Sequence, residues 1–410
     1  MMNKILKDQT NFCAKILILL LVYGSVSACQ NNTSSTLIQD TSPETVETWG
    51  ENRNIPEDYR PNLVTVRHHL QAYNRRGAST QFQAAASSSP RQLNFSLRDA
   101  PAIREEMDTT FLASYLMYEN GSVVIDEISP EGRFGDLINN RTPLYSMSLG
   151  KSLAGYLLGH AICAGYIGSI DQTLEDWPLV SDTLIANATV RDVVNSTLGD
   201  QDYFEGYSEA FVSTGRNAGD TNIGSIARNE LANSTPSSRR FSYGQFPANV
   251  ALNYISFKTG HQFNSFINRV LRDHVGIASG LEFNGVGPEH QGVIQSNFKA
   301  TRYDTLRIGI AILNDWNSNN CVGQYLQDVY ANRVSKGRRQ GDGYSRSYAG
   351  FFHTSYSGVS DTVMGMDGYG GIALLINFDE DRVVYTHAAH RNYDYRQFVL
   401  GAISGRDVFD

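Results

Sequence analysis

Ser148 and Lys151 form an S-x-x-K pair at the start of a long apolar stretch. On a helix, side chains three residues apart lie on one face, with Cβ atoms about 5–6 Å apart. A neighbouring lysine can take the proton of a serine hydroxyl only when its amine is neutral, and burial lowers the lysine pKa toward that state. A helix N-terminus also favours an oxyanion. The pair therefore predicts nucleophilic acyl transfer.

The same pattern occurs twice, so its surroundings decide which copy matters. Ser296 and Lys299 form the second copy, which has no comparable context. Residues 148–165, in contrast, are apolar nearly all round, which predicts a buried helix rather than a surface helix. The chain has only seven lysines, three of them before residue 16, so a lysine on a buried helix is an unusual placement.

Two predicted hairpins lie on either side of this helix in the sequence. Residues 111–118 and 122–127 are rich in β-forming residues and are joined by Glu119-Asn120-Gly121, a strong hairpin signal. Residues 372–378 and 382–388 form the second pair, and a last helix is expected at 395–402. We therefore expect an α+β fold in which both ends of the domain pair in one antiparallel sheet, flanked by helices, with a mainly helical region inserted.

The N-terminal residues indicate export. Residues 1–28 have a positive start, a short apolar core and the ending Val26-Ser27-Ala28, which predicts a signal peptide. Cys29 follows, as in a bacterial lipobox, so we expect its thiol to carry lipid; an ordinary secretory peptide is the alternative. Residues 29–95 are expected to be a tether and an extended arm, and residues 96–410 a single domain. The predicted location is the cell envelope, on the periplasmic or outer-membrane face.

The net charge and the cysteine and histidine residues limit the classes of partner, metal and cofactor that we expect. The 410 residues carry a net charge of −8 with no basic stripe, so nucleic acid is not an expected partner. With Cys29 lipidated, Cys163 and Cys321 could pair in an oxidising compartment or remain as two buried thiols. His387 and His390 have no carboxylate or cysteine at ligand spacing. We therefore predict no metal and no cofactor.

Residues 145–153 (YSMSLGKSL) resemble the nucleophile region of class C β-lactamase-like proteins. This family includes penicillin-binding carboxypeptidases, family VIII-type esterases and 6-aminohexanoate-dimer hydrolases. The resemblance extends over residues 96–405, and it implies a β-lactamase/transpeptidase-like fold with Ser148 as nucleophile. Further stretches match in the family's order, namely the Asn120-Gly121 hairpin, 165–177, 189–194, 196–199 and 300–309.

The family's second motif, Y-x-N or Y-x-S, resembles Tyr243-Gly244-Gln245. The placement is supported by Thr259-Gly260, sixteen residues on, where the family has a T-G pair. The resemblance implies that Tyr243 shares proton handling with Lys151 and that Gln245 contacts substrate. The alternative is that Tyr243 simply packs in the core.

The third motif of the family is K-T-G on a strand near the C-terminus. Lys258-Thr259-Gly260 is a literal K-T-G, but it lies at the end of a predicted helix, and we interpret it as a coincidence. The corresponding segment is Met366-Asp367-Gly368-Tyr369-Gly370-Gly371, with methionine in the lysine position.

Substrate contacts are expected in this segment from Met366, Asp367, Gly368 and Gly370, while the backbone N–H groups of Tyr369 and Ser148 form a candidate oxyanion hole. Asp367 could face a substrate amine or be a solvated turn residue.

We therefore expect a serine hydrolase that cleaves a small ester or linear amide through an acyl-enzyme on Ser148. The missing lysine at Met366 argues against a β-lactam or a peptidoglycan stem peptide, although a carboxypeptidase or weak β-lactamase remains an alternative. A non-catalytic envelope lipoprotein with the same fold is a further alternative, because Gln245 and Met366 depart from the family's motifs.

Overall fold

The structure is a computed structural model, and it describes residues 81–131, 134–135, 137–200, 222–337, 344–388 and 393–410. These residues all belong to one unit of the chain, which begins at Asp40. The predicted signal peptide, Cys29 and the predicted tether up to residue 80 lie outside the described residues. No helix within the described ranges is both long and apolar enough to span a membrane.

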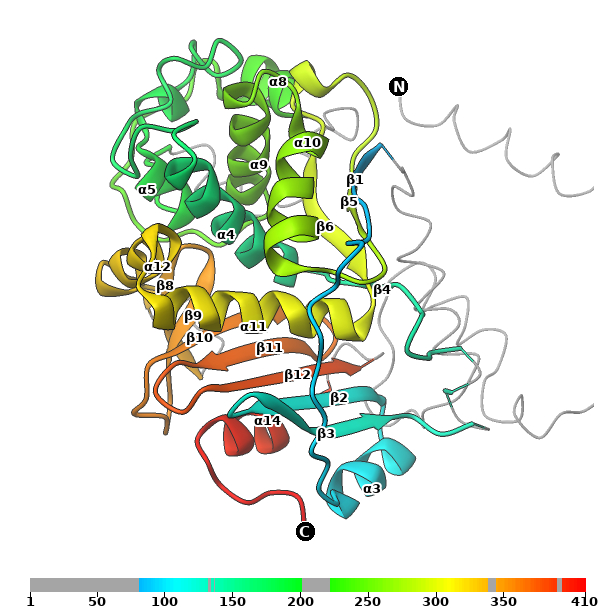
Figure 1. Ribbon diagram of the computed structural model, residues 1–410. Helices are drawn as coiled ribbons and strands as arrows, with labels where there is room; N and C mark the ends of the chain where they lie inside the picture. The colour runs from blue at the N-terminus through cyan, green and yellow to red at the C-terminus, as the bar shows by residue number, and fades with distance from the viewer. Residues whose placement is uncertain (1–80, 132–133, 136, 201–221, 338–343, 389–392) are drawn as a thin grey trace, which may run out of the picture. The chain divides into compact units, whose positions relative to one another are not determined.

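An eight-stranded antiparallel sheet forms the base of the described structure, with strand order β3-β2-β12-β11-β10-β9-β8-β7 (Figure 1). Strand β2 pairs with β12, so the two ends of the domain meet in one sheet, as expected from the sequence. The predicted turn between β2 and β3 has positive φ at both Asn120 and Gly121, which a two-residue type I′ turn requires. The strands are β2 (Leu112–Glu119), β3 (Ser122–Ile128), β7 (Val334–Ser335), β8 (Ser345–Ala349), β9 (Phe352–Tyr356), β10 (Val363–Gly368), β11 (Ile372–Asn377) and β12 (Arg382–Ala388).

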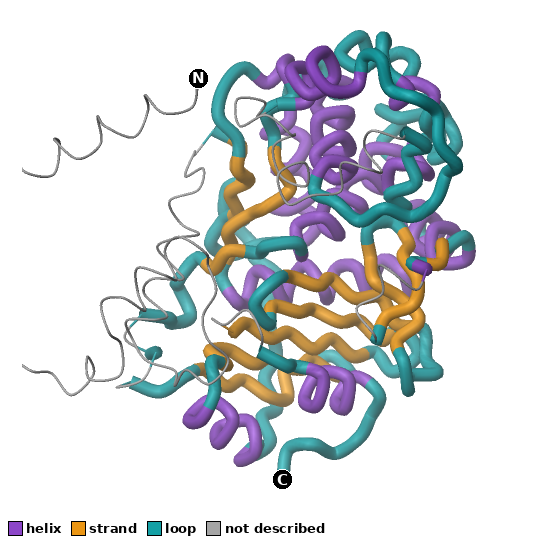
Figure 2. The backbone as a smooth tube through the Cα atoms, turned by 180° about the vertical axis from the view of Figure 1, so that it is seen from behind, coloured by secondary structure: helices purple, strands orange, loops and turns teal. Residues whose placement is uncertain are grey.

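Helices cover both faces of this sheet, as the front and back views show (Figures 1 and 2). Helices α4 (Leu149–Cys163) and α11 (Arg302–Ser318) pack on one face, and α3 (Pro101–Thr109) and α14 (Arg396–Ile403) on the other. Since side chains alternate along a strand, the sheet separates two apolar cores: Met366 lies in the core under α4, and Ala373 in the core under α14.

The region between β3 and β7 is mainly helical, as predicted. It also holds three strands of a small antiparallel sheet that the sequence analysis did not predict. The fourth strand, β1, comes from the segment before β2, and the strand order is β1-β5-β6-β4. Its strands are β1 (Phe82–Ala84), β4 (Leu144–Tyr145), β5 (Leu281–Asn284) and β6 (Gln295–Ala300). The remaining helices are α5 (Val190–Val194), α8 (Ile223–Ile226), α9 (Phe246–Lys258), α10 (Phe263–Ile267) and α12 (Cys321–Ala331), with the short elements η1 (Leu184–Asn187), η2 (Ala227–Leu231), η3 (Asn268–Val275) and η4 (Glu289–Gln291).

One long-range link ties the helical region to the large sheet, and a second joins two helices within that region. The buried Arg302 at the start of α11 donates to Asp126 at 2.6 Å and to Ser114 at 2.7 Å, which fixes α11 to β3 and β2. A disulfide joins Cys163 at the end of α4 to Cys321 at the start of α12. Of the two alternatives left open by the sequence, the structure therefore has the disulfide.

Candidate active site

The chain enters helix α4 through a tight turn that holds Ser148 at its first position. Met147, directly before the serine, has φ of 49°, a left-handed conformation that non-glycine residues adopt rarely. Two contacts with β6 hold this turn: Asn297 Nδ2 donates to the Met147 carbonyl oxygen at 3.0 Å, and the Phe298 N–H donates to Ser146 Oγ at 2.9 Å. The position of Ser148 is therefore set by strand β6.

Gly150, inside the S-x-x-K pair, permits the close approach of α4 to β6. A Cβ atom built on Gly150 would overlap the carbonyl oxygen of Ser296. Any side chain at position 150 would therefore push the nucleophile turn away from the strand that holds it.

Lys151 is buried, and its Nζ lies 2.6 Å from Ser148 Oγ. Burial lowers the pKa of Lys151 to about 7, and the negative charge of Asp367 opposes this shift. A substantial fraction of Lys151 is thus neutral near pH 7, and a neutral amine at this distance can accept the serine proton.

Tyr243 lies beside this pair, in the segment that leads into α9. The Lys151 Nζ atom is 4.7 Å from the centroid of the Tyr243 ring, a cation–π distance when the lysine is charged. The structure thus brings together the three residues that the sequence suggested for proton handling, Ser148, Lys151 and Tyr243, although these residues span 96 positions of the chain.

Gln245, which was expected to contact substrate, is buried instead. Its amide nitrogen donates to Ser296 Oγ, and to Asn249 Oδ1 at 3.4 Å. The Asn249 carboxamide also accepts from the Ser296 N–H at 2.9 Å. Gln245 therefore joins the start of α9 to strand β6 behind Gly150, so its contribution to the site in this structure is to support the strand.

The end of strand β10 lies next to the nucleophile turn. A Cβ atom built on Gly368 would be 2.8 Å from the Ser146 carbonyl oxygen, so only glycine lets the two backbones come this close. The following turn has Tyr369, which is 41% exposed, and Gly370, whose φ is 93°. The end of β10 therefore lies beside the turn that carries Ser148, and the oxyanion hole at Tyr369 and Ser148 stays a prediction.

Met366 and Asp367 do not face an open cleft. Met366 is fully buried in the core beneath α4. Asp367 points to the opposite face of β10, where its Oδ2 accepts from the Tyr395 hydroxyl at 2.7 Å. Burial, followed by the charge of Asp367, raises the pKa of Tyr395 well above its usual range. Asp367 is therefore neither a solvated turn residue nor a group directed at the serine.

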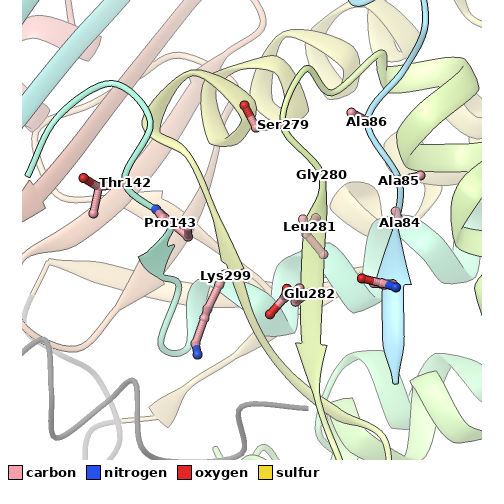
Figure 3. A pocket seen from close by; sticks show the side chains of 11 residues that line it. Ala84, Ala85, Ala86, Thr142, Pro143, Ser279, Gly280, Leu281, Glu282 and Lys299 are labelled. Atoms are coloured by element: carbon pink, nitrogen blue, oxygen red, sulfur yellow. The ribbon is translucent and has the colours of Figure 1, made fainter. Parts of the chain in front are cut away.

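Neither of the other two motifs supplies a side chain to the Ser148–Lys151 pair. Lys258 forms an ion pair with Asp176 at 2.6 Å at the end of α9, and Gly260 follows with a positive φ. Ser296 and Lys299 lie on β6, where alternation puts them on opposite faces. Figure 3 shows Lys299 at a separate pocket of about 520 Å³ over the small sheet, together with Glu282 from β5. None of the predicted catalytic residues lines this pocket.

One group beside the site was missed by the sequence analysis. His353, on β9, has its ring centroid 5.9 Å from that of Tyr243. The Nδ1 atom of His353 is 2.6 Å from Lys336 Nζ and 3.1 Å from Ser345 Oγ, and all three side chains are buried. These residues come from three neighbouring strand segments, so no sequence motif joins them. The scarcity of lysine was the one signal that could have drawn attention to Lys336.

Comparison with known proteins identifies the fold. No protein-family model and no curated protein matches the sequence. Among solved structures, a protein described as a 6-aminohexanoate-dimer hydrolase from Bacillus anthracis matches with a TM-score of 0.64 at 14% identity, covering 88% of this chain and 96% of that chain.

Two β-lactamase structures match less closely. A protein described as a β-lactamase from Bacteroides dorei has a TM-score of 0.54 at 17% identity, over 73% of this chain and 91% of that chain. A class C β-lactamase has a TM-score of 0.51 at 14% identity, over 74% of this chain and 92% of that chain. The chain therefore has the α+β β-lactamase/transpeptidase fold, which confirms the expectation from the sequence.

Proposed function

We propose that this protein is a serine hydrolase that cleaves an ester or a linear amide through an acyl-enzyme on Ser148. The observation that carries the proposal is the 2.6 Å contact between Ser148 Oγ and the buried Nζ of Lys151. A lysine is costly to bury, and here burial holds its pKa at about 7, the value that a general base needs near neutral pH.

In the first step, Ser148 Oγ attacks the substrate carbonyl carbon while neutral Lys151 takes the hydroxyl proton. The oxyanion is stabilised by the backbone N–H groups of Ser148 and Tyr369. Protonated Lys151, with Tyr243 beside it, then gives this proton to the leaving alcohol or amine. The bond between the leaving group and the carbonyl carbon breaks in the same step. In the second step, water attacks the acyl-enzyme, Lys151 receives the water proton, and Ser148 leaves with a proton as the acid is released.

The substrate class is proposed from two features. Methionine stands at position 366, so β10 offers no lysine for the carboxylate of a β-lactam or stem peptide. The structure with a TM-score of 0.64 is described as a 6-aminohexanoate-dimer hydrolase, whereas the two β-lactamases align with TM-scores of 0.54 and 0.51. Both features favour a linear amide or an ester.

The proposal is tested by covalent labelling of the purified protein with a fluorophosphonate probe. We expect labelling of the wild type at Ser148, loss of labelling in Ser148→Ala, and an unchanged thermal unfolding midpoint in that variant. Labelling should persist in Ser181→Ala, a control at an exposed serine whose hydroxyl donates to the Pro178 carbonyl oxygen. A panel of p-nitrophenyl esters, short linear amides and nitrocefin then separates the substrate classes.

An unlabelled wild type that also turns over none of these compounds would support the non-catalytic alternative. Turnover of nitrocefin in preference to the esters and amides would overturn the proposed substrate class and support a weak β-lactamase.

We also propose that the protein is a lipoprotein of the bacterial cell envelope, anchored through Cys29. The proposal rests on the lipobox-like ending of residues 1–28. The Cys163–Cys321 disulfide supports it, since such bonds persist mainly in oxidising compartments outside the cytosol.

A further inference from the structure

Three side chains with metal-binding chemistry meet far from Ser148. His160 lies near the end of α4, His274 in η3 and Asp315 near the end of α11. One ligand atom of each lies within 4.8 Å of the others. His160 is twelve residues after Ser148, which on a helix is about 18 Å, so this cluster is separate from the proposed catalytic site.

The distances within the cluster are close to those between ligands of one ion. His274 Nε2 is 2.9 Å from Asp315 Oδ2, and His160 Nε2 is 3.8 Å from the same oxygen. In a tetrahedral zinc site with bonds of about 2.0–2.1 Å, neighbouring ligand atoms lie roughly 3.3 Å apart. Shifts of a few tenths of an ångström to about one ångström would let all three atoms reach a common centre.

The Nε2 atom of His160 has no hydrogen-bond partner although it is buried. Its 3.8 Å distance to Asp315 is too long for a hydrogen bond. A buried polar atom without a hydrogen-bond partner lowers the stability of the folded state by roughly 1–3 kcal/mol. A bound ion would remove this penalty at His160 Nε2. It faces a carboxylate and a second imidazole, which together suit a cation.

We propose that His160, His274 and Asp315 bind a divalent transition-metal ion, with zinc as the best fit. Two imidazole nitrogens and one carboxylate oxygen are a ligand set that zinc accepts, with water in the fourth position. His274 is 39% exposed, so both the ion and this water can reach the site from solvent.

Neighbouring groups already orient the carboxylate. Tyr156 donates to Asp315 Oδ2 at 2.5 Å, and Asn320 donates to Oδ1 at 2.9 Å. Partners of this kind fix the orientation of a metal ligand. His274 Nε2 is also within hydrogen-bond distance of both Asp315 oxygens, at 2.9 and 3.1 Å, and a bound ion would replace this contact. The lone pairs that it now occupies would then be free for the ion.

The ion would connect three helices at one point. It would join the C-terminal part of α4 to η3 and α11, next to the disulfide between Cys163 and Cys321. Since α4 carries Ser148 at its other end, the bound metal would stabilise the helix that holds the nucleophile. Its role is structural, and it takes no part in the proposed acyl transfer.

The test is metal binding by the purified full chain after dialysis against EDTA. Titration with zinc chloride, followed by calorimetry, should give one site per chain with a Kd in the micromolar range or below. Saturation should raise the thermal unfolding midpoint by about 5 °C, because a ligand that binds only the folded state stabilises it. Cobalt(II) in place of zinc should give visible d–d absorption bands of a tetrahedral site.

His274→Gln is the informative variant, because its partly exposed side chain can be replaced without opening the core. We expect zinc affinity to fall at least tenfold and the cobalt spectrum to disappear. His290→Gln is the matched control, since His290 belongs to a separate, exposed histidine pair with His261 whose ring centroids lie 6.2 Å apart. It should bind zinc like the wild type.

Zinc binding that is absent in the wild type, or equal in wild type and His274→Gln, would overturn the proposal. The cluster would then be a hydrogen-bonded network around Asp315 alone. Labelling of Ser148 by a fluorophosphonate is measured separately, so either proposal can fail without the other.

Discussion

Lys151 combines two properties that are costly in isolation, a full positive charge and burial in an apolar helix. Burial disfavours the charged form, and this lowers the pKa of Lys151 to about 7, while Asp367 on the far face of β10 limits the shift. The amine can therefore alternate between the protonated and neutral forms under physiological conditions, which a proton carrier requires.

The rate of Ser148 labelling by a fluorophosphonate should therefore rise with pH and level off above about 7. Only the neutral amine accepts the serine proton, and below the pKa the neutral fraction falls by roughly tenfold per pH unit. Lys151→Arg is the control, because a guanidinium stays protonated throughout this range. A flat wild-type profile between pH 5.5 and 8.5 would show that Lys151 does not activate the serine.

At the scale of elements, the position of Ser148 depends on how closely helix α4 approaches strand β6. Asn297 and Phe298 hold the turn that precedes the serine, and Gly150 lets the helix lie directly on the Ser296 carbonyl group. Gln245 supports the same strand from the other side. The nucleophile is thus placed by a helix–strand contact as well as by its own helix.

Gly150→Ala should lower both stability and reactivity, since its Cβ would overlap backbone atoms that cannot rotate away. Overpacking of this kind costs about 1–3 kcal/mol, measured by urea unfolding, and the labelling rate should fall at least roughly tenfold as Ser148 shifts. Gly168→Ala is the matched control, because there the new Cβ meets only the flexible end of Gln172. Equal behaviour of the two variants would contradict this account of Gly150.

The elements that the sequence predicted are those with strong local signals. The Asn120-Gly121 turn, the apolar helix after Ser148 and the C-terminal hairpin all follow from periodicity and turn chemistry, and each was found within one or two residues of its predicted bounds. The small sheet was missed because β1, β4 and β5 have only two to four residues each. In addition, β1 pairs with β5 and β4 pairs with β6, and both partners lie far away in the sequence, as in the pairs Gln83–Glu282 and Leu144–Ala300.

The role of a single residue could be predicted where a sequence motif indicated it. It could not be predicted where the role depends on packing in the fold. Ser148 and Lys151 share a helical spacing, so their proximity follows from local geometry. The burial of Gln245 and Met366 depends on which face of a strand or helix meets the core, and the local sequence does not specify this. The cluster of His160, His274 and Asp315 was also missed, since its members come from three helices.

At the scale of the whole molecule, the chain has one sheet shared by its two ends and a helical region held to it by distant links. The disulfide joins residues separated by 158 positions, across almost the entire helical region. Closing a loop of this length restricts the unfolded chain strongly, by roughly 4–5 kcal/mol in the chain-entropy treatment. Such links persist mainly in oxidising compartments, so the proposed export would favour the stability of the domain.

The contributions of the lipid anchor and of the disulfide can be measured separately when the protein is expressed in a bacterium with residues 1–80 included. Cys29→Ala should shift the protein from the membrane fraction to the soluble fraction and abolish palmitate incorporation. The thermal unfolding midpoint should not change, because residue 29 lies outside the domain predicted at residues 96–410. Cys163→Ala should leave the protein in the membrane fraction but lower its midpoint by several degrees, since the loop closure is lost. A Cys29→Ala protein that still incorporates palmitate would rule out the proposed anchor, and a Cys163→Ala protein as stable as the wild type would show that the disulfide contributes little to folding.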